Sequence, residues 1–102
     1  MRLDKFLKVS RLFKRRTVAA EACDRGRVQI NSRPAKSGSK VKLGDEITIN
    51  FNQRIITVKV LELKDHVTKD EASELYELIS NEKVELEEIE TIDEDELELE
   101  EF

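Results

Sequence analysis

The chain has 102 residues, of which 40% are charged, and this length allows one compact domain with an appended segment. Its single cysteine excludes an internal disulfide and a cysteine-based metal cluster, and suits a reducing cytoplasmic environment. No apolar run approaches the roughly 18 residues of a membrane span, and no apolar segment follows the basic N-terminus. We therefore expect neither a membrane anchor nor a secretory signal.

The net charge of −5 conceals two halves of opposite sign. Residues 1–64 hold 16 lysines and arginines against 6 acidic residues, a balance of +10. Residues 65–102 hold 2 against 17, a balance of −15. A small domain with so large a positive charge is electrostatically suited to a polyanion.

The first element in chain order is a short helix over residues 2–9. Leu3, Phe6 and Leu7 fall at the i, i+3, i+4 spacing of one apolar helical face. Asp4 lies in the first turn, where the helix dipole favours an anion, and we expect it to pair with Lys8 one turn later.

A second helix follows a basic connection over residues 10–16, in which Leu12 and Phe13 are expected to pack inward. Thr17 is the expected N-cap, and Gly26 is expected to end the helix in a left-handed conformation. The predicted buried face of this helix consists of small residues, namely Val18, Ala19, Ala22 and Cys23.

From residue 27 the apolar period changes to two, which predicts strands. Val28 and Ile30 mark the first strand, which leads into a turn at residues 31–34 and a polar loop over residues 35–42. Val41 and Leu43 are expected to return to the core before a turn at Gly44. An antiparallel hairpin with its turn at residues 52–53 follows, and its inward positions are Ile47, Ile49, Phe51, Ile56, Val58 and Val60.

The last predicted element is a helix over residues 69–81, which could dock on the sheet or stand apart. Thr68 and Glu71 have capping-box spacing, and the apolar residues Ala72, Leu75, Tyr76 and Ile79 follow at helical spacing. Residues 83–102 are dominated by acids, and such a composition predicts disorder.

The predicted fold class is α+β, with two N-terminal helices packed on a small curved antiparallel sheet, a further C-terminal helix, and then a disordered acidic tail. The corresponding division of the chain is a basic domain at 1–64, a helix at 65–82 and the tail at 83–102.

The densest cationic segment is the connection from Arg11 to Arg16, which directly precedes Thr17 at the expected start of a helix. Free backbone N–H groups and the positive end of the helix dipole favour a phosphate at such a position. Arginine offers paired donors to phosphate, whereas lysine acts as a point charge. The alternative, in which this run is only a solvated face, stays open.

Four segments, residues 2–7, 11–19, 26–31 and 41–47, resemble the ribosomal-protein-S-four-type RNA-binding domain in order and spacing. The resemblance spans about residues 1–60, and it implies that a helical face and its adjoining loop dock on structured RNA. It places Arg2, Arg11, Lys14, Arg15 and Arg16 on that face and Lys36 in the loop after the first strand. Lys5 and Lys8 on the first helix complete the predicted set.

Among stand-alone members, the chain looks most like the RqcP and heat-shock-protein-fifteen-like quality-control factors. This implies a cytoplasmic, non-enzymatic factor, monomeric when free and without a cofactor. Such a factor binds rRNA and peptidyl-tRNA on stalled large ribosomal subunits and supports alanine tailing of the nascent chain by a partner protein. The acidic extension after Lys83 is longer than the family leads us to expect.

No catalytic centre is predicted. His66 is the only histidine and is expected to be solvated, while Cys23, Phe6, Phe13 and Phe51 fit core positions. No EF-hand spacing or glycine-rich phosphate loop is present. The alternative function is a protein-interaction module whose acidic half binds a basic partner, and the tail could also fold back on the basic domain as an RNA mimic.

Overall fold

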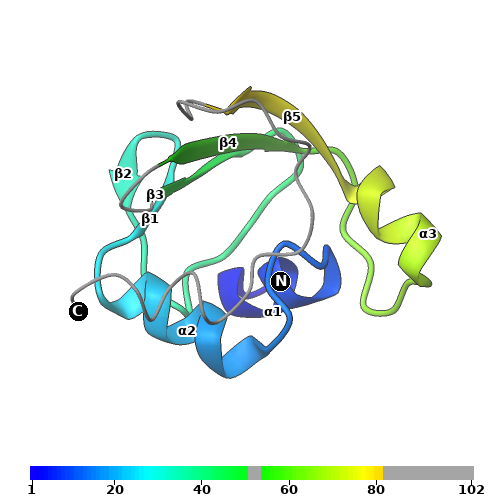
Figure 1. Cartoon of the computed structure of the whole chain (residues 1–102), viewed down its shortest axis with the longest axis horizontal. Helices are drawn as coiled ribbons and strands as arrows, with labels where there is room; N and C mark the ends of the chain where they lie inside the picture. Colours follow the sequence, from blue (N-terminus) through cyan, green and yellow to red (C-terminus); the bar gives the residue numbers. More distant parts are fainter. Residues whose placement is uncertain (51–53, 82–102) are drawn as a thin grey trace.

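The computed structural model describes residues 1–50 and 54–81. Helices α1 (Leu3–Val9) and α2 (Arg16–Asp24) cover one face of an antiparallel sheet, and a short helix α3 (Lys69–Ala72) lies at one end (Figure 1). The α+β class is therefore confirmed. The predictions for Phe51, for the turn at 52–53 and for the tail at 83–102 lie outside the described residues. None of the described helices is long and apolar enough to cross a membrane.

The sheet has five strands in the order β2-β1-β3-β4-β5, and every neighbouring pair is antiparallel. The predicted hairpin is confirmed, with Ile47 opposite Val58 and Ile49 opposite Ile56. All four side chains are buried against the helices, as their alternation predicts. The strands are β1 (Val28–Ile30), β2 (Arg33–Pro34), β3 (Glu46–Asn50), β4 (Ile55–Val60) and β5 (Tyr76–Asn81).

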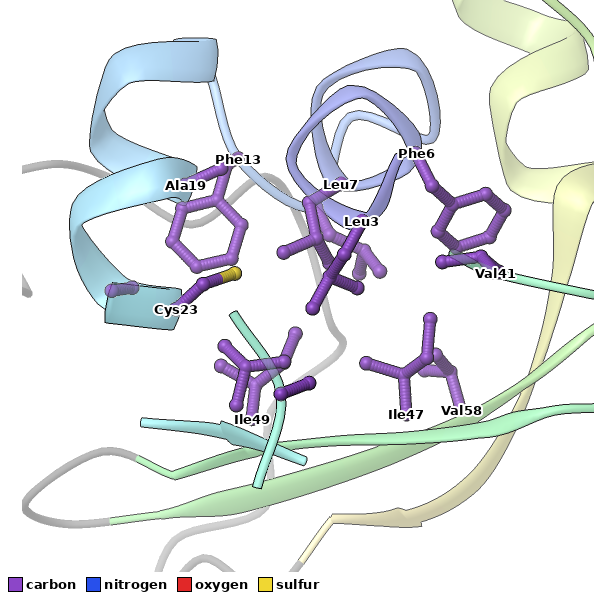
Figure 2. Close-up of a cluster of buried hydrophobic side chains, with 14 of the residues drawn as sticks. Leu3, Phe6, Leu7, Phe13, Ala19, Cys23, Val41, Ile47, Ile49 and Val58 are labelled. Carbon is purple, nitrogen blue, oxygen red and sulfur yellow. The ribbon is translucent and has the colours of Figure 1, made fainter. Parts of the chain in front are cut away.

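A single apolar core lies between the helices and the sheet (Figure 2). Phe6 from α1 and Phe13 from the connection between the helices are fully buried, as predicted. Ala19 and Cys23 on α2 are also buried, so small side chains face the core where α2 approaches its neighbours. Burial raises the pKa of the Cys23 thiol to about 12. Cys23 therefore acts as a small apolar core residue.

Helix α2 ends in a Schellman motif at Gly26, as its sequence position predicts. The Gly26 N–H donates to the Cys23 carbonyl at 3.0 Å, and the Arg27 N–H donates to the Ala22 carbonyl at 2.9 Å. Gly26 has a φ of +81°, a conformation that costs little only for glycine. The motif reverses the chain directly into β1.

The prediction that Leu43 returns to the core is wrong, because its side chain is 64% exposed. The Asp45 N–H donates to the Lys42 carbonyl at 3.1 Å and closes a tight turn with Leu43 and Gly44 at its corner. A corner residue projects away from the sheet. Only Val41, which precedes the turn, reaches the core.

The helix predicted over residues 69–81 begins as expected but ends early. The Thr68 side chain accepts from the Glu71 N–H at 3.3 Å, and the Glu71 carboxylate accepts from the Thr68 N–H at 2.9 Å, which completes the capping box. The α-helix stops at Ala72, and residues 73–75 form a 3-10 turn, η1 (Ser73–Leu75). Residues 76–81 form β5, so the helical prediction for them is wrong.

Pairing with β4 explains why these residues form a strand. Tyr76 lies opposite Val60, Leu78 lies opposite Val58, and a bulge between Thr57 and Val58 leaves Ile79 without a directly opposite residue. The edge of β4 supplies backbone partners that local helical spacing does not reveal. Leu75 therefore ends the 3-10 turn inside the core and directs the chain onto the sheet.

Leu75→Ala tests whether this C-terminal segment is an integral part of the fold. We expect the variant to lower the free energy of unfolding by about 2–5 kcal/mol, because Leu75 is fully buried and its loss leaves a cavity. The midpoint and slope of urea unfolding measure this loss. Leu78→Ala is the matched control, since its side chain is 45% exposed and its loss should cost under about 1 kcal/mol. Equal effects at the two leucines would contradict the docking of this segment.

Candidate nucleic-acid interface

A buried aspartate joins the beginnings of the two N-terminal helices. Asp4 lies in the first turn of α1, and its side chain is only 6% exposed. Its carboxylate accepts from Arg2 Nε at 3.3 Å, Arg2 Nη2 at 3.4 Å and Arg16 Nη2 at 3.3 Å. The Lys5 N–H adds a fourth hydrogen bond at 2.7 Å.

The predicted pairing of Asp4 with Lys8 is wrong. Helical side chains lean towards the N-terminus of their helix, so Asp4 points away from Lys8 and towards the start of α2. Packing of α2 against α1 then brings Arg16 within reach, although it lies 12 residues further along the chain.

The charge of Asp4 is set by opposing effects. Burial raises the pKa of this carboxyl. Hydrogen bonds from Arg16, Arg2 and the Lys5 amide, together with the Arg16 charge, lower the pKa, and their combined effect outweighs that of burial. The resulting pKa lies below the ordinary value for aspartate. Asp4 is therefore ionised at neutral pH and orients both guanidinium groups.

The polar loop over residues 36–39 closes on the same place. The Ser39 carbonyl accepts from the Leu3 N–H at 2.7 Å, and the Ser37 carbonyl accepts from the Asp4 N–H at 3.1 Å. These bonds satisfy backbone donors that the first turn of a helix leaves unpaired. Asp24, at the end of α2, holds the loop by accepting from the Ser37 N–H at 3.0 Å and from its hydroxyl at 3.2 Å.

We call Arg2, Asp4, Arg16 and the loop at 36–39 the Asp4 junction. The Arg2 and Arg16 side chains are 56% and 47% exposed, so each keeps part of its guanidinium accessible to solvent. A Cβ atom added at Gly38 would lie 3.7 Å from Arg2 Nη2, which places that guanidinium against the loop. Lys36 is exposed on the same loop, with Nζ 3.4 Å from the Asp24 carbonyl. The fold thus brings together three of the predicted cations.

The N-cap of helix α2 lies two residues earlier than predicted. The first residue of the helix is Arg16, and the N-cap is Arg15, whose side chain makes no capping hydrogen bond. Thr17 lies inside the first turn, so the prediction that it is the N-cap is wrong. The backbone N–H groups at this end are not capped by a side chain, and Lys14 and Arg15 are exposed immediately before them.

The other predicted cations lie further along α1 and just after it. Lys5 pairs with Asp65 in the linker after β4, with Nζ 2.9 Å from Oδ1. The hydrogen bond and charge of Lys5 hold the pKa of Asp65 below its ordinary value. Lys8 and Arg11 border a cleft beside His66, which is exposed as predicted. Sequence reasoning missed the contribution of residues 65–67, because only a contact between residues 60 positions apart reveals it.

No group of three histidine, cysteine or acidic side chains in residues 1–50 and 54–81 is arranged to hold a metal ion.

Asp4→Asn should lower the free energy of unfolding at pH 7 by about 1–3 kcal/mol, since it removes an ionised acceptor shared by two guanidinium groups. The folded pKa of Asp4 is lowered, so its contribution is present above the unfolded pKa, near 4, and is lost as pH falls through the folded pKa. The stability gap between wild type and variant should therefore close in acid. Urea unfolding from pH 7 to pH 2 measures it.

Glu74→Gln is the control for this experiment, because Glu74 is exposed and lies outside the Asp4 junction. Its effect should be small at every pH. An Asp4→Asn variant as stable as wild type at pH 7 would contradict the role of Asp4 in joining the helices.

Comparisons with known proteins identify the family to which this arrangement belongs. Residues 1–47 match the S4 domain family. The chain is 56% identical over 84 residues to the RQC P-site tRNA stabilizing factor of Bacillus subtilis, covering 82% of this chain and 98% of that protein. It is 51% identical over 85 residues to the protein of the same name from Streptococcus pneumoniae, and the alignment covers 83% of this chain and 97% of that protein.

A solved structure agrees with these sequence relationships. Heat Shock Protein 15 of Vibrio cholerae, described as trimeric, superposes with a TM-score of 0.72 at 29% identity, covering 78% of this chain and 82% of that chain. The resemblance identified from residues 2–47 is therefore confirmed. The chain belongs to the family of RQC P-site tRNA stabilizing factors and carries an S4 domain in its N-terminal half.

Proposed function

We propose that this protein is an RNA-binding accessory factor of ribosome-associated quality control. It binds P-site tRNA on stalled large ribosomal subunits, contacts their rRNA, and acts by holding RNA rather than by catalysis. The names of its relatives supply the tRNA and the pathway, and the alignment extends over nearly their whole length. The +10 charge of residues 1–64 suits a polyanion of this kind.

The Asp4 junction is the observation that carries this proposal. Two guanidinium groups share one buried carboxylate, and both remain about half exposed. A guanidinium has five N–H donors, so Asp4 occupies only some of them. Arginines fixed in this way meet phosphate oxygens with little further loss of side-chain freedom.

The start of α2 adds a second set of donors to the same surface. Its backbone N–H groups are not capped by a side chain, and the helix dipole favours a phosphate there. Lys14 and Arg15 lead into this end, and Lys36 approaches from the loop. We assign the main RNA contacts to Arg2, Arg16 and these three cations, with Lys5, Lys8 and Arg11 as an extension along α1.

We further propose that the bound peptidyl-tRNA is held in a position from which a separate tailing protein extends the nascent chain with alanine. In this proposal the factor acts in the cytoplasm and is monomeric when free. Residues 1–64 form the RNA-binding unit, and residues 83–102 form an appended acidic tail.

Arg16→Ala should weaken binding to large ribosomal subunits that carry peptidyl-tRNA by about tenfold or more, because it removes a charged donor from the phosphate-binding surface. The slope of log affinity against log salt should also fall by about one. Co-sedimentation of the full chain at several salt concentrations measures both quantities, and thermal unfolding confirms that the variant is folded.

Lys59→Ala is the matched control, because Lys59 is exposed on β4 among residues that alternate with the buried face. Its loss should change affinity little. If wild-type protein stays at the top of the gradient at low salt, the proposed function is wrong. If the two variants bind equally well, the assignment of the interface is wrong.

Asp4→Asn separates fixed geometry from total charge. The substitution adds one unit of positive charge to the basic domain, so long-range attraction alone would strengthen RNA binding. We expect binding to weaken roughly fivefold instead, because Arg2 and Arg16 lose the acceptor that orients them. Glu62→Gln adds the same charge away from the junction and should leave affinity unchanged or slightly higher. A gain in affinity for Asp4→Asn would contradict a role for preorganised arginines.

A further inference from the structure

A cleft of about 250 Å³ lies at the end of α1 opposite the Asp4 junction. It is lined by Lys8, Val9, Arg11, Asp65, His66 and Val67. The two valines are partly buried against the core, whereas the His66 imidazole is exposed. Charged and polar side chains thus converge on the cleft beside two valines, a combination that can orient a small polar ligand.

Within residues 1–50 and 54–81, no acidic side chain pairs with the cations Lys8 and Arg11 at this cleft. In the part of the chain that the structure describes, Arg2, Lys5 and Arg16 each contact an aspartate, but the side chains of Lys8 and Arg11 have no such partner. Asp65 is the one acid at the cleft, and its carboxylate already binds Lys5 at 2.9 Å. An anion is therefore favoured at the end formed by Lys8 and Arg11 rather than beside Asp65.

The backbone at Arg11 supports a role for its side chain. Arg11 directly follows the last residue of the α1 C-terminal turn with a φ of +61°, a conformation that favours glycine at this position. For any other residue it costs about 1 kcal/mol or more. The chain keeps an arginine there at that cost, and Arg11 lines the cleft.

We infer that this cleft binds one unpaired nucleotide of the RNA, an inference that rests on the proposed function. The phosphate contacts Lys8 and Arg11, and the base stacks on the His66 imidazole beside Val9 and Val67. The volume is below the roughly 300–1,000 Å³ of sites for drug-sized ligands, which suits a single base. Single-stranded nucleotides are commonly held by stacking on His or aromatic rings beside a basic surface.

Nucleotide titration of the isotope-labelled full chain tests the cleft directly. We expect adenosine and uridine 5′-monophosphate to shift the backbone amide signals of Val9, Arg11, His66 and Val67, with millimolar dissociation constants. Inorganic phosphate should shift those of Arg11 alone, and more weakly. If phosphate shifts all four signals as strongly as the nucleotides do, the cleft is an anion site only and the inference is wrong.

Variants then test whether the cleft takes part in RNA binding. Arg11→Gly and His66→Ala should each weaken binding to large subunits carrying peptidyl-tRNA by about tenfold. Arg11→Gly should also leave stability unchanged or higher, because glycine relieves the strained φ. His66→Phe should retain most of the affinity, since it preserves a stacking ring.

Ser32→Gly is the matched control for Arg11→Gly. Ser32 has a φ of +68° in the turn between β1 and β2, so glycine relieves the same kind of strain away from the cleft. It should leave RNA affinity unchanged. Wild-type affinity in both cleft variants, with Arg16→Ala still impaired, would overturn the nucleotide site and leave the proposed function intact. If the wild-type protein does not bind these large subunits, the proposed function itself is wrong.

Discussion

The arrangement of the two N-terminal helices and of the loop at 36–39 depends on the ionised carboxylate of Asp4. It is buried and would be costly to keep charged without partners, so the fold must hold Arg2 and Arg16 against it. This requirement ties the start of α2 to the start of α1. The backbone of the same turn binds the loop at 36–39, and Asp24 fastens that loop to the far end of α2. Asp4, its backbone and Asp24 together connect α1, α2 and the loop at 36–39 to one another.

Much of the fold follows from patterns that are local in sequence. The i, i+3, i+4 spacing of Leu3, Phe6 and Leu7 depends only on helix geometry. Gly26 ends its helix because glycine adopts the left-handed conformation more readily than other residues do. The errors occur where a distant partner decides the outcome. Residues 76–81 have apolar spacing compatible with a helix, but the open edge of β4 pairs with them as a strand. Leu43 is apolar but exposed, because its place at the corner of a turn directs its side chain away from the core.

The candidate site, like the fold, is predicted from sequence only in part. Sequence alone reveals the cations, because charge is a property of each residue, but it does not show how the fold groups them. Arg2 and Arg16 are 14 positions apart and share one acceptor, whereas Lys8, closer to Asp4 in sequence, lies at the other end of α1. Residues 65–67 carry no motif that links them to α1. Their place beside the helix is set by the return of the chain from β4 and by the contact between Lys5 and Asp65.

The two ends of α1 are suited to different parts of RNA recognition. An arginine that already binds Asp4 gains less electrostatic energy from a phosphate than an unpaired cation does, because part of its charge is compensated. Its orientation is fixed before binding, so it contributes to where the RNA lies more than to how strongly it is attracted. Lys8 and Arg11 have no acidic partner in the described chain, so in the proposed interface they would supply the larger attraction per contact. A factor that holds a tRNA in one position benefits from both kinds of contact, and in the proposed interface they lie near opposite ends of α1, a helix of 7 residues.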